Sequence, residues 1–339
     1  MTLKLFPLFV LGACSVSAQP TEYLRSPDVN WAAIIELVLP ADPLLASANE
    51  PKEAAMAVLK LTSDDQSLYG YVGHSLNAKL WDLASTGEWE AFADANLTQL
   101  ISPDEVLLKT NAPDTTLTYD PETYKEKMEV TWDLRPMPDQ ITYLKVRQLL
   151  TYDDAKGRFS ILTLAIAPYD NGKTPYWLKV PPSDPPDPEL LETPDINWAV
   201  RYVTRNSSPQ IRDFQVVKEE NGPVMEVFFE KMQSAIHIPL YGAINHFEPL
   251  SPNLRACLFN CTDTTISVDP ETYSEHTQIV RSGLKYEDIT DLELIQEWYF
   301  DESAGELFTR LVAVAPRFRY YFQEGEWHPR IGFYRKCTD

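Results

Sequence analysis

The sequence predicts an α+β protein built from two tandem, diverged repeats, each a small antiparallel sheet with a packed amphipathic helix. Three observations predict this class. Short motifs occur twice in the same order, apolar residues alternate along two long hairpins, and apolar residues recur at helical spacing ahead of each hairpin. The length of 339 residues leaves room for about two domains.

The motif repeat is the most informative of the three. Three pairs of motifs keep their order at offsets of 167, 149 and 148 residues: SPDVNWA at 26–32 with TPDINWA at 193–199, DTT and DPETY at 114–124 with the same letters at 263–273, and strands ending in Ala-Pro at 167–168 and 315–316. Such an order indicates internal duplication. The predicted parts are a signal peptide (1–18), a first repeat (19–179), a stiff Pro-rich linker (180–193) and a second repeat (194–339).

Alternating apolar residues predict one long β-hairpin in each repeat. One face of its first strand carries Leu144, Val146, Gln148, Leu150 and Tyr152 in repeat one, and Leu292, Leu294, Gln296, Trp298 and Phe300 in repeat two. The return strands are expected at 159–167 and 307–315. Gly157 and Gly305 stand in the connecting turns, where a residue with positive φ is needed.

Apolar residues spaced by four predict an amphipathic helix ahead of each hairpin, through Leu68, Val72, Leu76 and Leu80 and through Val224, Phe228, Met232 and Ile236. The DPE triplets at 120–122 and 269–271 are interpreted as helix starts, with Asp as N-cap and Pro in the first turn. The segments after Trp31 and Trp198 fit a strand or a helix, and we favour a strand for 198–203.

The N-terminus predicts export. A basic residue precedes an apolar run at 5–13, which is too short to span a bilayer and fits a cleaved signal peptide. Two cleavage sites compete. VSA at 16–18 suits ordinary signal peptidase and gives a mature chain from Gln19, which we favour, whereas LGAC at 11–14 resembles a lipobox and would lipidate Cys14. No later apolar run approaches the ~20 residues of a transmembrane helix.

The chain is strongly acidic, with a formal net charge of −21 and an isoelectric point of about 4.6. Such a field repels nucleic acids and anionic lipid headgroups, so neither is an expected partner. It favours a basic protein partner, or it serves only to keep the protein soluble.

Residues that could carry chemistry are few. GHSLN at 73–77 approaches the G-x-S-x-G motif of hydrolases, but Asn77 replaces the final Gly and the motif lies in a helix pattern, which disfavours Ser75 as a nucleophile. The carboxylates of the DPETY motifs are explained by capping. We therefore expect no catalytic residue, no metal and no cofactor.

Three cysteines remain in a mature chain that starts at Gln19, namely Cys257, Cys261 and Cys337. In an oxidising compartment one disulfide is expected, with one thiol left over, and the sequence does not show which two residues pair. The C-x₃-C spacing has no second pair beside it, which disfavours a zinc site.

The motifs of the second repeat, taken in order, resemble the PorN/GldN family of periplasmic ring subunits of the type IX secretion system. The resemblance rests on NWAVRY at 197–202, FEPLS at 247–251, QEWYFD at 296–301, AVAP at 313–316 and IGFY at 331–334. The first repeat matches less well, because RQLLTYD at 147–153 lacks the aromatic centre of the hairpin motif.

The resemblance implies a structural role. It implies a non-catalytic subunit of a periplasmic ring complex at the inner face of the outer membrane, serving type IX secretion and gliding motility. The implied partners are a ring-forming lipoprotein and further copies of the chain within the ring. The alternative is an exported or lipid-anchored binding module for a protein or glycan ligand, and a hydrolase is the third hypothesis.

Aromatic and basic residues of the second repeat are the candidate contact surface: Trp298, Tyr299, Phe300, Arg317, Arg319, Tyr320 and Tyr321. Core packing is the simpler explanation of the aromatic residues. A protein interface, in which Tyr, Trp and Arg are enriched, is the functional one. The local basic charge would suit contact with an acidic subunit.

Overall fold

The computed structural model describes most of the chain after the N-terminal region. The described residues are 24–41, 56–59, 76–110, 112–119, 123, 125–133, 141, 143–169, 172–182, 196–207, 215–220, 222–242, 248–301, 303–321 and 327–337. The signal peptide, Cys14, Ser75 and most of the Pro-rich linker lie outside this part, so the predictions on them stay predictions. Below, "first half" means the residues before the linker and "second half" those after it.

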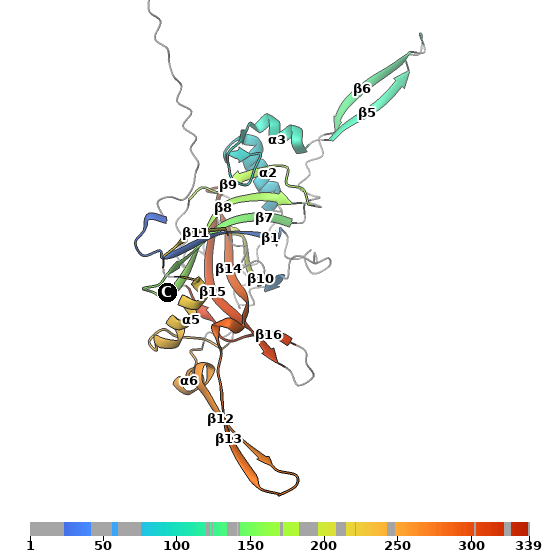
Figure 1. The fold of residues 1–339 in the computed structure, drawn as a ribbon. Helices are drawn as coiled ribbons and strands as arrows, with labels where there is room; N and C mark the ends of the chain where they lie inside the picture. The colour runs from blue at the N-terminus through green and yellow to red at the C-terminus, as the bar shows by residue number, and fades with distance from the viewer. Residues whose placement is uncertain are drawn as a thin grey trace, which may run out of the picture.

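The fold is mixed α+β, as predicted, and its centre is a pair of curled antiparallel sheets (Figure 1). The seven-stranded sheet has the order β11(Gln215–Glu219), β1(Trp31–Pro40), β7(Tyr143–Asp153), β8(Arg158–Tyr169), β9(Trp177–Lys179), β3(Ala91–Phe92) and β4(Leu100–Ile101). The six-stranded sheet has the order β16(Trp327–Ile331), β15(Glu306–Tyr321), β14(Ile289–Asp301), β10(Ile196–Ser207) and β2(Met56–Leu59), with β17(Arg335–Lys336) also on β15.

The two predicted hairpins are confirmed as β7–β8 and β14–β15, and Figure 1 shows one pair lying across the other. The residues predicted for one face of each first strand do line one shared core, with Leu144 and Tyr152 packed in the same cluster as Leu292 and Trp298. Both turn glycines have positive φ, +57° for Gly157 and +63° for Gly305, so the turn chemistry read from the sequence is correct.

The α-helices with given bounds in the described residues are α2(Leu76–Thr86), α3(Pro103–Thr110), α5(Val224–Ser234) and α6(Pro252–Asn260), and a short 3₁₀ helix, η4(Tyr286–Asp288), precedes β14. Helix α5 buries Val224, Phe228 and Met232 as predicted, but Ile236 lies beyond its end and is 77% exposed. Helix α2 begins at Leu76; the predicted positions Leu68 and Val72 fall outside the described residues. Strands, not helices, follow Trp31 and Trp198.

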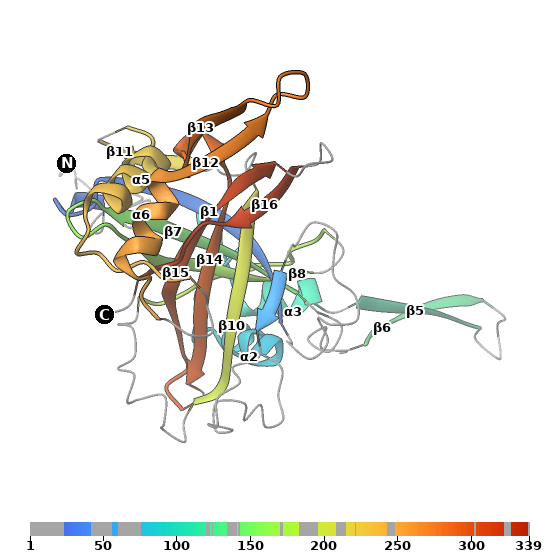
Figure 2. The same cartoon turned by 90° about the horizontal axis from the view of Figure 1, so that it is seen from below.

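Two further hairpins were not predicted. Arm 1 is β5(Ala112–Tyr119) with β6(Glu126–Asp133), and arm 2 is β12(Cys261–Val268) with β13(Glu275–Ser282). Figures 1 and 2 show both arms projecting from the body in different directions. The interpretation of 269–271 as a helix start is wrong, because Asp269 opens the turn of arm 2 and its carboxylate accepts the amides of Glu271 and Thr272. Asp followed by Pro opens a β-turn as readily as a helix.

Each sheet takes an edge strand from the other half of the chain. Strand β2 of the first half pairs with β10 in the six-stranded sheet, and β11 of the second half pairs with β1 in the seven-stranded sheet. The hydrophobic core also runs through both halves as one cluster. The division of the sequence into 19–179 and 194–339 therefore does not correspond to two separately packed bodies.

Candidate interaction surfaces

The predicted aromatic contact surface is buried in this structure. Trp298 and Phe300 face the shared core and are 0% and 3% exposed, and Trp298 packs edge-on against Tyr202 with ring centroids 6.0 Å apart. Tyr299 points to the opposite face of β14 and is 1% exposed. A partner cannot touch these three side chains in this conformation, so core packing explains them.

A buried ion pair accounts for Tyr299. Its hydroxyl donates to Glu297 Oε2 at 2.5 Å, and the same oxygen accepts Arg310 Nε at 2.6 Å. The Arg310 guanidinium also lies 5.8 Å from the centre of the Tyr299 ring. Glu297 is 2% exposed and its charge is matched by Arg310. These contacts between Tyr299, Glu297 and Arg310 therefore hold the two strands of the hairpin together and leave no free acid or base.

The predicted surface has two basic residues, Arg317 and Arg319. Arg317 Nη1 lies 3.2 Å from the Glu293 carboxylate. Arg335, outside that set, is also engaged within the chain, since its Nε donates to Gly157 O at 3.2 Å. Arg319 is exposed. The side chains of Tyr320 and Tyr321 lie outside the described part, so their role as contacts stays a prediction.

Several of the exposed large apolar residues of the described chain lie on the arms. In arm 2, Ile266, Val268 and Ile279 are 62%, 54% and 66% exposed. The register pairs Ile266 with Thr277 and Thr264 with Ile279, so alternation puts all three aliphatic residues on one face. Tyr273, at the tip, is 81% exposed. The same register positions in arm 1 hold Leu117, Tyr119 and Val130.

Each arm is a two-stranded sheet whose strands pair only with one another among the described residues. An isolated two-stranded hairpin is marginally stable in water, and unpaired edges invite the addition of a strand. An apolar face with open edges is therefore the kind of surface that a partner covers. The sequence held a signal for it, since DPETY is flanked by β-branched residues on both sides.

Arm 2 is mounted on the body through α6. The Arg255 guanidinium of α6 donates to the carbonyls of Met232, Ala235 and Ile238, at and just beyond the end of α5. A cation suits this position because the last carbonyls of a helix carry partial negative charge. At the other end of α6, Leu284 N donates to Leu258 O at 2.7 Å. The base of arm 2 is thus fixed to the core.

One cysteine lies in the core and another lies on α6, at the base of arm 2. Cys257 on exposed α6 is disulfide-bonded, whereas Cys337 is a free thiol that is buried. Burial raises the pKa of Cys337 to about 12. The side chain of Cys261 lies outside the described part, so the pairing of Cys257 stays open here.

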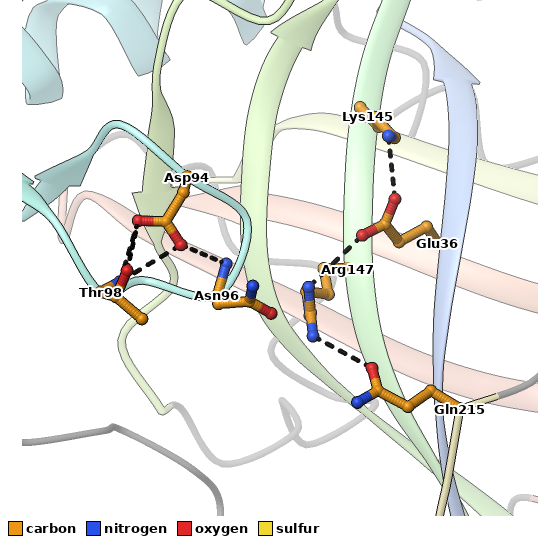
Figure 3. A network of polar contacts seen from close by, with 7 residues as sticks. All are labelled: Glu36, Asp94, Asn96, Thr98, Lys145, Arg147 and Gln215. Carbon is orange, nitrogen blue, oxygen red and sulfur yellow. Dashed lines mark hydrogen bonds and ion pairs between the residues drawn. The ribbon is translucent and has the colours of Figure 1, made fainter.

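Polar networks order the outer surface of the seven-stranded sheet (Figure 3). Glu36 on β1 accepts Lys145 Nζ at 2.9 Å and Arg147 Nη1 at 3.4 Å, and Arg147 reaches Gln215 of β11 at 3.5 Å. This network ties the second half's edge strand to the first half's sheet. The ionic partners of the Glu36 carboxylate are basic side chains, so the site does not resemble a metal centre.

The loop at 94–99 is ordered by Asp94, also drawn in Figure 3. Its carboxylate accepts Asn96 N at 2.9 Å, Thr98 Oγ1 at 2.8 Å and Gln99 N at 2.9 Å. Burial acts to raise the pKa of Asp94, but these hydrogen bonds outweigh it and hold the pKa below the usual value. The Asp94 carboxylate therefore serves to stabilise this loop, which includes Leu97 at φ +57°.

Only the last two residues of the GHSLN motif at 73–77 lie in the described part. Ser75 lies outside it, and Asn77 is buried in α2, where its Nδ2 donates to Ile141 O at 2.7 Å. No group of three or more His, Cys, Asp or Glu residues in the described ranges could hold a metal ion. No helix among those ranges is long and apolar enough to cross a membrane.

Comparison with known proteins finds a family match in the second half. The family model described as "Gliding motility associated protein GldN" matches residues 204–334. The match covers α5, α6, arm 2 and the β14–β15 hairpin, and it confirms the resemblance inferred from the motifs. No curated protein matches the chain. Over residues 204–334, the chain is thus similar to the GldN family of gliding-motility-associated proteins.

Proposed function

We propose that the protein is a non-catalytic structural subunit of a periplasmic ring complex of the type IX secretion and gliding machinery, and that it binds a partner ring lipoprotein. The GldN match over 204–334 carries the proposal, because it spans the body of the second half together with arm 2. The exposed apolar residues of the arms support it, because a scaffold needs surface that a protein partner can cover.

The arms are the proposed contact elements. They combine an exposed aliphatic face with acidic tips that contain Asp269, Glu271 and Glu275 in arm 2. A surface of this kind fits a partner groove that is apolar along its floor and basic at its rim. The buried aromatic hairpin then has a different task, which is to hold the platform from which the arms project.

The proposal is tested with the full mature chain and the purified ring lipoprotein of its own secretion system. Mixed together, they are expected to form large assemblies, visible by electron microscopy and by size-exclusion chromatography with light scattering. A monomer that shows no association with the lipoprotein would overturn the proposal.

A matched pair of variants locates the contact. Ile266→Ser with Ile279→Ser removes the aliphatic face of arm 2, and we expect affinity for the lipoprotein to fall at least tenfold, as loss of central apolar contacts does. Ser267→Ala lies on the other face of the same strand and is expected to leave affinity unchanged. Equal behaviour of the two variants would mean that arm 2 is not the contact.

The alternative, an exported or lipid-anchored binding module, depends on the N-terminus. Its lipid-anchored form carries a lipid on Cys14, which the mass of the mature protein reveals. The alternative itself requires no assembly with the ring lipoprotein, so the first experiment separates the two functions.

A further inference from the structure

The contacts between the two halves are reciprocal. Strand β2 extends from the first half onto β10, where Ala57 stands opposite Val203, and β11 extends from the second half onto β1, where Gln215 stands opposite Ile34. Each of these edge strands lies in the chain between its half's opening strand and its first described helix. Each half therefore supplies an edge strand from the same position in its sequence to the sheet of the other half.

The ends of the two long hairpins are held in the same reciprocal way. Trp89 Nε1 of the first half donates to Gly305 O in the turn of β14–β15, at 3.2 Å. Arg335 Nε of the second half donates to Gly157 O in the turn of β7–β8, also at 3.2 Å. The two acceptor glycines differ by the repeat offset of 148 residues. Each turn is thus fixed by the other half.

The buried centre shows the same relation. Gln148 and Gln296, both 0% exposed and again 148 residues apart, donate to one another across the halves at 2.9 and 3.2 Å. A bulge interrupts each hairpin at this position, between Arg147 and Gln148 and between Ile295 and Gln296. A residue that meets its own counterpart marks the axis of a two-fold arrangement.

Helix α5 completes the shared core. Phe228 packs against Tyr152 and Phe159 of the first half, with ring centroids 5.9 and 5.2 Å apart, and against Phe333 of the second half at 6.2 Å. Without the first half, the inner side of this helix and the edge of β10 would face water. The apolar side of α5 and the open edge of β10 would then each have to be covered by another protein surface.

We propose that the chain is a single-chain pseudodimer, in which two GldN-type units bind one another by a two-fold, strand-exchanged interface. The surface of 204–334 that the first half covers is then a docking surface for a second GldN-type unit, supplied here by the same chain. The proposal rests on strand register and contacts and does not depend on a ring lipoprotein.

The test uses the full mature chain with a protease site placed between Pro182 and Ile196 and cleaved after purification. The two fragments are expected to stay together in native mass spectrometry and size-exclusion chromatography. They should separate only in denaturant, at the concentration where the intact chain loses its folded signal. Fragments that separate in native buffer and keep folded spectra would overturn the proposal.

Cysteine pairs test the exchange itself in the cleaved protein. Ile34→Cys with Gln215→Cys and Ala57→Cys with Val203→Cys join residues that are opposite in register across the halves, so oxidation should link the fragments covalently on a gel without reductant. Ile34→Cys with Lys218→Cys is out of register and should not link them. Association of the fragments without either link would show an interface that lacks strand exchange.

Discussion

Gln148 and Gln296 form a buried pair of amides, each donating to the other's oxygen, and Gln296 Oε1 also accepts Trp298 Nε1 at 3.1 Å. Gln148→Met or Gln296→Met leaves buried groups without a partner and should lower the free energy of unfolding by about 1–3 kcal/mol. The double variant removes both amides, so its loss should be smaller than the two single losses added together. Urea denaturation of the four proteins measures this coupling.

Gln99→Met is the control for that cycle, because Gln99 is exposed and its side chain is not in the core. It should leave the urea midpoint within error of the parent. Additive losses for the two core variants would mean that the glutamines do not act as a pair.

The buried thiol of Cys337 predicts a pH dependence. Its pKa is raised to about 12 in the folded chain, whereas an unfolded cysteine titrates near ~8.5. Above pH ~8.5 the thiol of the unfolded state loses a proton that the folded state keeps. The free energy of unfolding should therefore fall as pH rises, by up to ~1.4 kcal/mol per pH unit. Below pH ~8.5 the contribution of Cys337 to that free energy is constant. Cys337→Ala should show a shallower decline in denaturation midpoint between pH 8 and 10.

Thiol labelling gives an independent check on the same residue. Iodoacetamide at pH 8 should modify Cys337 only after denaturant is added, because the thiol is buried and protonated in the folded state. Rapid labelling of the native protein would contradict the burial.

Gly283 is expected to be intolerant of a side chain. A Cβ there would lie 2.4 Å from the carbonyl oxygen of Phe259, a backbone atom at the end of α6 that cannot turn aside. Gly283→Ala should therefore destabilise the protein by about 1–3 kcal/mol. Differential scanning calorimetry measures the change. In Gly242→Ala the new Cβ meets only the end of Leu250, at 3.1 Å, so a melting temperature close to the parent's is expected.

The mature N-terminus is predicted to be Gln19. Intact-mass analysis of the protein recovered from its own envelope fraction should give the mass of a chain that begins there. A diacylated Cys14 would instead assign the chain to lipid-anchored proteins and favour the binding-module alternative.

Local signals in the sequence were sufficient for the central hairpins. Alternation identified the core-facing residues of β7 and β14, and the two turn glycines adopt the positive φ that the pattern demands. The start of α3 also had a readable signal that our sequence analysis missed. Ser102 and Glu105 form a capping box, in which each accepts the other's backbone amide.

Other features had no local signal. Nothing near β2 or β11 shows that each pairs with the opposite half, because strand partnership over such separations is decided by the assembled core. The aromatic run at 298–300 fits an interface or a core equally well by composition, and only packing against Tyr202 and the shared cluster decides for the core. DPE at 269–271 was ambiguous for a similar reason, since the same residues suit a turn and a helix start.

The exchanged edge strands have a consequence for the order in which the protein is made. A chain that emerges from the N-terminus delivers β1, β7 and β8 long before β11, and β2 long before β10. The seven-stranded sheet cannot be completed until Glu219 has emerged, and the six-stranded sheet cannot be completed until Lys336 has. The early strands therefore wait with open edges that are prone to mispairing. Such a protein acquires its structure late, after most of its length has emerged, and a holding chaperone would raise its yield more than it would for a chain of independent domains.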